Sequence, residues 1–357
     1  MGKEFTNVNK LAKLLHPHRQ EMVITEVIEE NSTMKTYVLK SAGGQELAYF
    51  NAGDYIPVFV EIDGNQIERP YALASSPKES TEGIYAISVK KANGGYVSSW
   101  IHENWKVGSA VTVGGPGAGL NYNPIRDSKH IIALAGGIGI TPMRSMAKAL
   151  IDGDIDCKIT LFYGANTQEE IAYAQEWKNL EAAAGGKLKV ILVIANEDVA
   201  GCEKGFITLD MVKKYCEIDN SSWFICGPAG MEKAVKDFLD PLNIPRRYVR
   251  FGMGGDSGYH TADTGTCKIT VHFKGETRVI DALCSETVLM ALEKAGYQPA
   301  VKCRSGKCGF CRSLVVSGSY ESVVEEDGVR RADRKYGYIH PCSTRPTGDL
   351  EIIVQSR

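Results

Sequence analysis

The sequence predicts a multidomain β plus α/β plus α+β protein, in which an antiparallel β-barrel precedes a parallel-sheet domain and a small α+β domain. Three observations support this prediction. Short alternating segments separated by glycine turns come first, which is typical of antiparallel strands. Apolar strands that alternate with helical segments follow, as in βαβ units. The chain then ends in a strand pair, a helix and a loop rich in cysteine.

The β-barrel is expected at residues 21–126, after a polar and basic extension at residues 1–20. Turn residues such as Asp63-Gly64 separate short β-branched or alternating segments, and this spacing is typical of a small antiparallel barrel. The predicted strands are Met22–Ile28, Thr36–Lys40, Tyr55–Ile62, Ile84–Lys90 and Ala110–Val113.

The parallel-sheet domain is expected at residues 127–252. Its predicted strands are His130–Ala135, Lys158–Tyr163, Lys187–Ile194 and Trp223–Cys226. Helical spacing lies between or after them at Pro142–Ile151, Glu169–Ala183, Thr208–Lys214 and Met231–Leu239.

A linker rich in Gly, Ser, Asp and Thr is expected at residues 253–266, and the last domain at residues 267–357. In that domain we predict strands at Lys268–Phe273 and Thr277–Ile280 and a helix at Thr287–Ala295.

Composition and charge argue against two classes of protein. The formal net charge of −2 disfavours a nucleic-acid-binding protein, which needs a concentrated basic surface. No run of about 18 apolar residues exists, so no membrane-spanning helix is expected. The N-terminus lacks the apolar segment of a secretory signal. Ten cysteines without such a signal indicate thiols or metal ligands in a reducing compartment, and we therefore expect a cytoplasmic protein.

Four cysteines near the C-terminus have the spacing of a plant-type [2Fe–2S] site. Cys303, Cys308 and Cys311 form a C-x4-C-x2-C run, and Cys342 follows further on. A zinc site is the alternative, but zinc sites usually pair two C-x2-C units and only one is present. We therefore assign a [2Fe–2S] cluster to these four cysteines and treat most of the other six cysteines, which show no ligand spacing, as ordinary buried thiols.

An arginine and a tyrosine two residues apart indicate a site for a phosphorylated aromatic cofactor. In Arg69-Pro70-Tyr71-Ala72 the guanidinium suits a phosphate, and the tyrosine ring can stack on a flat heterocycle. Downstream, Gly94-Gly95-Tyr96-Val97-Ser98 is a glycine turn that opens a helix, whose N-terminus presents free N–H groups to an anion. Tyr55 places another aromatic ring at a strand start. Taken alone, the first motif is equally typical of a surface strand with a packed tyrosine.

Two further turns each follow a predicted strand and open a helix. They are Gly136-Gly137-Ile138-Gly139-Ile140-Thr141-Pro142 and Cys226-Gly227-Pro228-Ala229-Gly230-Met231. Glycines there let the backbone approach a pyrophosphate. Both turns fall at the carboxyl ends of predicted parallel strands, where open α/β sheets bind ligands. A tight strand–helix turn without a ligand is the alternative for each turn alone.

The order of these motifs resembles the ferredoxin–NADP reductase superfamily, and is similar in particular to three-domain oxygenase reductases with a C-terminal ferredoxin. The resemblance covers about Met22 to Val354. It implies a flavin-binding β-barrel, a nucleotide-binding parallel sheet and a β-grasp-like plant-type ferredoxin domain. It also implies two catalytic candidates, because Tyr71 stacks on the flavin and Cys226 lies close to where hydride moves.

The resemblance further implies which residues bind the flavin and the nicotinamide nucleotide. The cofactor-binding candidates are Tyr55, Arg69, Pro70, Tyr71, Ala72, Ser88, Val89, Lys90, Gly95, Tyr96, Val97, Ser98, Gly136, Gly137, Ile138, Gly139, Thr141, Pro142, Asn166, Cys226, Gly227, Pro228 and Met231.

The sequence departs from that family at two positions. Ala72 stands where the family usually has Ser or Thr, whose hydroxyl bonds flavin N5. The backbone N–H of Ala72, or another hydroxyl such as that of Thr141, would have to replace it. Arg250 precedes Phe251 where the family often has Glu, which puts a role for that acid in doubt but not the fold.

The resemblance favours FAD over FMN, because the turn at Gly94–Ser98 is closer to FAD-binding members. For the nucleotide we favour NADH over NADPH. Asn166 follows a strand where NADP-binding relatives tend to place an arginine for the 2′-phosphate, and an amide cannot supply that charge. Lys204, or a positive charge elsewhere, could overturn this expectation.

Together the three sites are expected to convert hydride into single electrons for a separate redox partner, such as an oxygenase, because a flavin can take two electrons and release them one at a time. An anaerobic acceptor such as a hybrid-cluster or corrinoid protein, a redox-sensing iron–sulfur flavoprotein, and a pseudo-reductase without flavin are the alternatives. Basic residues near the cluster, either a solvated face or a surface that steers an acidic partner, are Lys302, Arg304, Lys307, Arg312 and the run 330–335.

Overall fold

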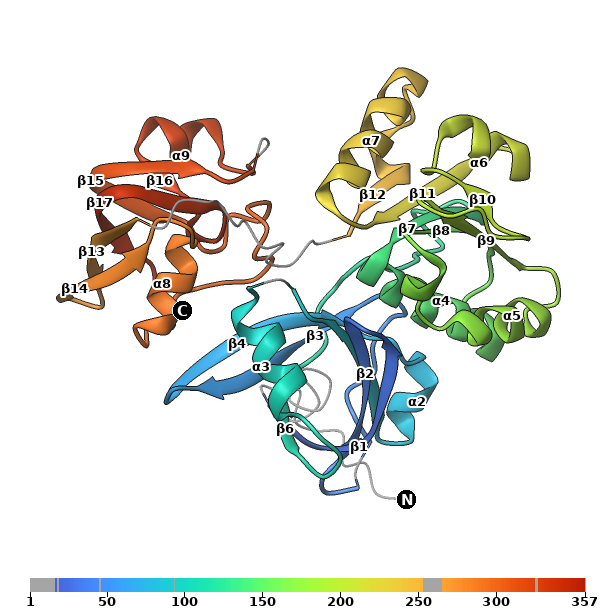
Figure 1. Ribbon diagram of the computed structural model, residues 1–357, viewed down its shortest axis with the longest axis horizontal. Helices are drawn as coiled ribbons and strands as arrows, with labels where there is room; N and C mark the ends of the chain where they lie inside the picture. Colours follow the sequence, from blue (N-terminus) through green and yellow to red (C-terminus); the bar gives the residue numbers. More distant parts are fainter. Residues whose placement is uncertain are drawn as a thin grey trace, which may run out of the picture. The chain divides into compact units, whose positions relative to one another are not determined.

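The computed structural model describes residues 17, 19–44, 46–92, 94–252, 265–324 and 327–356. Most of the predicted extension at residues 1–20 and of the predicted linker at residues 253–266 lies outside them. The chain divides into two compact units. The first contains Met1–Val58, Tyr71–Lys91 and Ser98–Met253, and the second contains Phe59–Pro70, Ala92–Val97 and Gly254–Arg357. Three sheets, each with its helices, are visible along the chain (Figure 1).

The first sheet is antiparallel and has six strands in the order β4-β3-β6-β1-β2-β5. Along β3 every second side chain is buried, which is the period expected of a half-buried strand. The strands are β1 (Gln20–Asn31), β2 (Met34–Ser41), β3 (Tyr55–Ile62), β4 (Asn65–Ala72), β5 (Ile84–Lys90) and β6 (Ala110–Val113), with helices α2 (Pro77–Thr81) and α3 (Tyr96–Asn104). Strand β4, which carries the Arg69–Ala72 motif, was not among the predicted strands.

The second sheet is parallel, with the order β10-β9-β8-β7-β11-β12. Its strands are β7 (His130–Gly136), β8 (Lys158–Ala165), β9 (Leu188–Ile194), β10 (Glu203–Lys204), β11 (Ser221–Cys226) and β12 (Val249–Phe251). Its helices are α4 (Thr141–Asp152), α5 (Ala174–Ala183), α6 (Leu209–Tyr215) and α7 (Ala229–Leu239).

Both faces of this sheet are covered, so its strands are apolar throughout. Ile131 and Ala133 of β7 join a core with Trp177 of α5, while Ile132 joins a separate core with Leu239 of α7. The continuous apolar run in β7 therefore reflects burial on both faces.

One predicted helix is shorter than expected. The sequence pattern predicts a helix over Glu169–Ala183, but only α5 is α-helical, after a short 3-10 turn at Gln168–Glu170. Tyr173 has a φ of +57°, in the left-handed region, and it directly precedes α5. A tyrosine there is uncommon, and the surrounding contacts must hold it in place.

The third sheet is mixed and has the order β14-β13-β17-β15-β16, with β13 and β17 parallel. Its strands are β13 (Thr266–Phe273), β14 (Glu276–Leu283), β15 (Ser313–Ser322), β16 (Tyr338–Ile339) and β17 (Thr344–Val354). Helix α8 (Val288–Lys294) contributes Val288, Ala291 and Leu292 to its core, and α9 (Arg331–Lys335) follows β15. Among the described helices, none is long and apolar enough to cross a membrane.

A buried ion pair connects β12, at one edge of the parallel sheet, to the segment that precedes β7. Arg250 of β12 contacts Asp127 at 2.6 Å and donates from Nη1 to the Asn121 carbonyl at 2.6 Å. Its guanidinium lies over the Phe224 ring, 4.0 Å from the centroid. The Asp127 side chain is fully buried, and burial lowers the pKa of Arg250 to about 10.

We predict that Asp127→Asn lowers the free energy of unfolding by about 3 kcal/mol, because it leaves a buried guanidinium without its carboxylate. Urea unfolding followed by circular dichroism measures this loss. Adding Arg250→Met to Asp127→Asn should recover part of it, because the two residues interact directly.

Asp156 provides the control for this prediction. It pairs with Lys129 and Lys187, but its side chain is 74% exposed. Asp156→Asn should leave the unfolding midpoint nearly unchanged, because exposed ion pairs contribute little. An equal loss from Asp127→Asn and Asp156→Asn would contradict the assigned role of the buried pair.

Candidate functional site

The four cysteines of the C-terminal motif converge in the structure. Three are buried, namely Cys303, Cys311 and Cys342, whereas Cys308 is exposed. The sulfurs of Cys311 and Cys342 lie 3.4 Å apart. Hydrogen bonding from the thiols of Cys308 and Cys342 lowers the pKa of the Cys303 thiol.

Backbone N–H groups of the loop point at these sulfurs. The N–H of Gly306 donates to Cys342 Sγ at 3.2 Å, and that of Phe310 donates to Cys308 Sγ at 3.5 Å. Gly306 has a φ of +74°, and a Cβ there would lie 2.5 Å from Ser343 Oγ, so only glycine fits. Four thiols with N–H donors aimed at them suit the negative charge of a [2Fe–2S] cluster.

Arg304 of the cluster loop is buried, with a side chain only 1% exposed. Its two terminal nitrogens donate to both carboxylate oxygens of Glu293, each at 2.8 Å. Glu293 also accepts a hydrogen bond from Arg69 Nη1 at 3.0 Å. The sequence-based hypothesis that Arg304 steers a partner is therefore wrong, because its charge faces a carboxylate inside the second unit.

Carboxylates also partly neutralise the other basic residues. Asp333 binds Arg312 at 3.0 Å and Arg330 at 2.8 Å, and Asp327 pairs with Arg334. Lys302 and Lys307 are exposed on the cluster loop itself. The basic surface beside the cluster is thus smaller than the sequence indicates.

In the first unit, the ends of three barrel strands lie close together, and these ends carry several of the flavin candidates. The Leu73 N–H donates to the Asp54 carbonyl at 2.9 Å, and Leu73 also forms a bridge with Ile87 of β5. The end of β4 with Tyr71 and Ala72 is therefore adjacent to the start of β3 at Tyr55 and to the end of β5, where Ser88, Val89 and Lys90 lie.

The remaining flavin candidates are Arg69, Pro70, Gly95, Tyr96, Val97 and Ser98; all but Ser98 belong to the second unit. Gly95, Tyr96, Val97 and Ser98 form the start of α3 and the turn before it. The Arg69 side chain is nearly buried and contacts the Glu293 carboxylate at 3.0 Å, so a flavin phosphate would have to share or replace this partner.

The two nucleotide candidate loops pack directly against each other. A Cβ on Gly139 would lie 2.0 Å from the Cys226 carbonyl oxygen, and one on Gly136 would lie 2.6 Å from Met231 Sδ. Gly139 therefore has no room for a side chain, whereas a side chain at Gly136 would require the Met231 side chain to move. The Lys90 Nζ lies 3.6 Å from the position of a Cβ on Gly137, so the end of β5 reaches the same loop.

This packing gathers most of the nucleotide candidates. Gly136, Gly137, Ile138, Gly139, Thr141 and Pro142 lie at the end of β7 and the start of α4, beside Cys226, Gly227, Pro228 and Met231. The backbone cradle they form fits a pyrophosphate. The Thr141 hydroxyl donates to the Ile138 carbonyl at 2.9 Å, which commits its proton within the loop.

Asn166 directly follows β8, whose Gly164 pairs with Gly136 of β7. Its side-chain amide donates to Glu170 at 3.0 Å, and its backbone N–H donates to the same carboxylate at 3.2 Å. Close by in sequence, the Gln168 N–H donates to Glu197 at 2.7 Å. Two carboxylates therefore lie near the carboxyl ends of β8 and β9.

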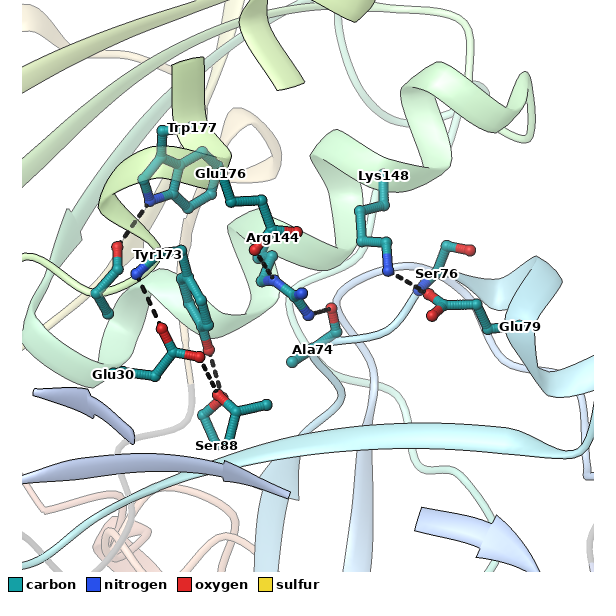
Figure 2. A network of polar contacts seen from close by, with 12 residues as sticks. Glu30, Ala74, Ser76, Glu79, Ser88, Arg144, Lys148, Tyr173, Glu176 and Trp177 are labelled. Carbon is teal, nitrogen blue, oxygen red and sulfur yellow. Dashed lines mark hydrogen bonds and ion pairs between the residues drawn. The ribbon is translucent and has the colours of Figure 1, made fainter. Parts of the chain in front are cut away.

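Sequence reasoning missed a polar network between the barrel strands and the nucleotide domain, all within the first unit (Figure 2). The Ser88 hydroxyl bonds Tyr173 and, at 2.8 Å, Thr36. Glu30 accepts from Thr36 at 2.7 Å and from the Tyr173 N–H at 3.1 Å. Burial raises the pKa of Glu30 despite these bonds. The side chain of Ser88 is thus engaged in this network, so only its backbone is left to line a flavin.

Helix α4 adds a second group of contacts to this network. Arg144 and Ser145 bind carbonyls just beyond β4, and Lys148 binds Glu79 at 2.6 Å. The only sequence signal for them was a polar residue within an otherwise buried helical pattern.

Family comparisons match all three parts of the chain. Residues 21–122 match an oxidoreductase FAD-binding domain, and residues 133–237 match an oxidoreductase NAD-binding domain. Residues 271–347 match a 2Fe-2S iron-sulfur cluster binding domain.

Relatives share this arrangement along nearly their whole length. The glycine betaine monooxygenase reductase subunit of Pseudomonas aeruginosa is 28% identical over 347 residues, which cover 92% of this chain and 93% of the relative. The ferredoxin reductase component of the 3-ketosteroid-9-alpha-monooxygenase of Mycobacterium tuberculosis is 26% identical over 357 residues, covering 94% and 95%. The crystal structure of phthalate dioxygenase reductase has the same fold, with a TM-score of 0.72 at 22% identity, covering 94% of this chain and 98% of that one.

These matches confirm the predicted fold class and the predicted set of FAD, a nicotinamide nucleotide and a [2Fe–2S] cluster. The chain belongs to the ferredoxin–NADP reductase superfamily, as a three-domain oxidoreductase that binds FAD, a nicotinamide nucleotide and a C-terminal [2Fe–2S] cluster.

Proposed function

We propose that this chain is an NADH-dependent reductase that supplies electrons, through FAD and the [2Fe–2S] cluster, to a separate protein such as the oxygenase component of a monooxygenase. One observation carries the proposal. The chain combines two glycine-rich loops, packed together at the carboxyl ends of β7 and β11, with a four-cysteine loop whose N–H groups point at its sulfurs. The named activities of the relatives support an oxygenase as acceptor.

We assign the flavin domain to residues 21–126, the nucleotide domain to residues 127–252 and the ferredoxin domain to residues 267–357, with residues 253–266 as linker. A cytoplasmic location is our proposal too. It is supported by the ten cysteines, which are all free thiols in the structure and four of which we assign as cluster ligands.

The residues of this chain bind and orient the cofactors. When bound, FAD accepts the hydride of NADH as two electrons and releases them singly to the cluster. We assign Tyr71 to stacking on the flavin ring, Arg69 to its phosphates, and the Gly136–Pro142 loop to the pyrophosphate of the nucleotide. Cys226, packed against Gly252, borders the place where the nicotinamide would lie.

Anaerobic addition of NADH should bleach the flavin and then give the paramagnetic signal of a reduced [2Fe–2S] cluster. Cys342→Ser should abolish that signal and keep flavin bleaching, because it removes one cluster ligand. Cys284→Ser, which alters a buried thiol of the same domain, should keep both. A chain whose flavin is not bleached by NADH would contradict the proposed function.

The preference for NADH is supported by the two carboxylates near the ends of β8 and β9. Glu170 and Glu197 place negative charge where relatives that use NADPH need positive charge, and a carboxylate can accept a bond from a ribose hydroxyl. Lys204, the residue that could have reversed this preference, lies 3.6 Å from Asp198.

We predict that Glu170→Lys combined with Glu197→Lys raises the ratio of kcat/KM for NADPH to that for NADH at least about tenfold, which corresponds to about 1.4 kcal/mol. Steady-state reduction of ferricyanide with each nucleotide measures the ratio. Glu181→Lys, in the last turn of α5, is the control and should leave it unchanged. An unaltered ratio in the double variant would remove these two carboxylates from nucleotide selection.

The exposed side of the cluster is where a partner would dock. Cys308 is the exposed ligand, and Phe310 beside it is 55% exposed. Lys302 and Lys307 are exposed on the same loop. We propose that this surface receives an acidic partner, with Phe310 as an apolar contact, because complementary charges speed encounter.

Charge reversal of Lys302 and Lys307 to Glu should speed the reduction of cytochrome c, a basic acceptor, about tenfold at low salt, and the gain should vanish at high salt. Reduction of a small uncharged quinone provides the reference rate, because its encounter with the loop does not depend on the loop's charge. Lys178→Glu on α5 should change the rate for neither acceptor. Equal cytochrome c rates for the charge-reversed and unaltered chains at low salt would refute this docking surface.

A further inference from the structure

Two side chains of helix α4 bind main-chain carbonyls in the segment just after β4, the strand that carries the flavin motif. Arg144 Nη1 donates to the Ala74 carbonyl at 2.8 Å, and Ser145 Oγ donates to the Ser75 carbonyl at 2.7 Å. Ala74, Ser75 and Ser145 are completely buried, so water cannot replace these bonds. Figure 2 shows Arg144 reaching from α4 to Ala74. Both partners belong to the first unit.

The Arg144 guanidinium is held from further sides. Its Nε donates to Glu176 of α5 at 2.8 Å, and its central carbon lies 4.8 Å from the centroid of the Tyr173 ring. The hydroxyl of Tyr173 in turn bonds Ser88 of β5 (Figure 2). Only 12% of the Arg144 side chain is exposed. One rigid side chain therefore joins α4, α5 and the segment after β4.

The two ends joined by this side chain lie close, along the chain, to the two cofactor sites. Ala74 follows Tyr71 by three residues in nearly extended chain, and Arg144 follows the loop that ends at Pro142 by two residues. Only one or two residues separate each cofactor segment from the hydrogen bond between Arg144 and Ala74, and these residues are buried or half-buried. A change at the contact would therefore move one segment relative to the other.

We propose that Arg144 is a positioning residue for hydride transfer, which aligns the nucleotide loop with the flavin strand without touching either cofactor; this rests on the proposed function. Hydride transfer needs reacting atoms about 3–3.5 Å apart, and a shift of about 1 Å can cost about a hundredfold in rate. Binding tolerates such a shift better, because the pyrophosphate and flavin contacts remain.

The chemistry of the contact requires arginine. One planar guanidinium donates to a carbonyl and to a carboxylate in different directions while its face covers an aromatic ring. A lysine ammonium keeps the charge but cannot satisfy all three contacts. Arg144→Lys is therefore a mild variant that keeps the local charge and tests alignment.

Lys148 offers a matched control on the same helix, one turn further from the loop. It also joins α4 to the barrel region, through Glu79 of α2, but it binds a side chain rather than the main chain next to the flavin motif. Lys148→Met removes that ion pair, and our proposal expects it to leave hydride transfer within about twofold of the unaltered chain.

The experiment is anaerobic stopped-flow reduction of the flavin by NADH and by NADH deuterated at the transferred C4 position. For Arg144→Lys we expect the limiting rate of flavin reduction to fall about a hundredfold. The kinetic isotope effect should increase, and the Kd for NADH and the flavin content should change less than about threefold. Ser145→Ala, which removes only the second carbonyl contact, should show a smaller fall of the same kind.

Hydrogen exchange of the full chain gives a readout that does not depend on turnover. Arg144→Lys should speed exchange of the Leu73 and Ala74 amides, which donate to Asp54 and Ala86 in the folded chain. Lys148→Met should speed exchange only in α2.

Three results would overturn the proposal. These are an unchanged rate in Arg144→Lys, a loss of rate that a weaker Kd or lost flavin fully explains, and an equal loss in Lys148→Met. If Arg144→Lys does not fold, an unchanged rate in Ser145→Ala refutes the proposal in its place. Failure of NADH to reduce the unaltered chain would instead reject the proposed function.

Discussion

The close contact between Gly139 and the Cys226 carbonyl is the constraint on which the catalytic half of the molecule depends. With a Cβ position only 2.0 Å from that oxygen, no side chain can separate the loop before α4 from the loop before α7. The contact joins two neighbouring strands, β7 and β11, at their carboxyl ends. It thereby fixes where α4 begins, and so where Arg144 and Ser145 meet the flavin strand's continuation. The proposed alignment by Arg144 therefore depends on a backbone contact elsewhere in the same sheet.

Much of the fold could be predicted from the sequence, because the alternation of buried and exposed positions gives each strand or helix a recognisable spacing of apolar residues. Strands β3, β5 and β6 have the predicted bounds, since alternation or a β-branched run marks each of them. Strand β4 was missed because a charged pair and Pro70 look like a turn, although a proline is tolerated at a strand's end. The helix expected from Glu169 was overestimated, because Tyr173 takes a left-handed backbone that only tertiary contacts stabilise.

Some features of the candidate site could likewise be predicted from local sequence, whereas others depend on contacts with residues far away in the chain. Ligand spacing alone predicted the cluster cysteines, and the structure brings Cys311 and Cys342, which are 31 residues apart in the chain, to 3.4 Å between their sulfurs. Arg304 and Lys307 are three residues apart in that loop and look alike in sequence, yet one is buried and the other exposed. The difference comes from Glu293, a residue of α8 whose approach to the loop no local pattern reveals. Removing this carboxylate would leave buried guanidinium groups without an anion, which is costly.

The contacts of Arg144 explain why alignment residues escape motif searches. Arg144 and Ser145 donate to the main-chain carbonyls of Ala74 and Ser75. Any amino acid would supply such a carbonyl, so the sequence of the flavin motif does not reveal this contact. Main-chain acceptors also suit the task, because a carbonyl on a buried segment moves only if the backbone itself moves. A side-chain acceptor such as Glu79 can follow its lysine by changing rotamer, and so transmits little displacement. A reductase whose cofactors bind to separate domains therefore needs at least one contact of the first kind, and Arg144 provides it next to both binding segments.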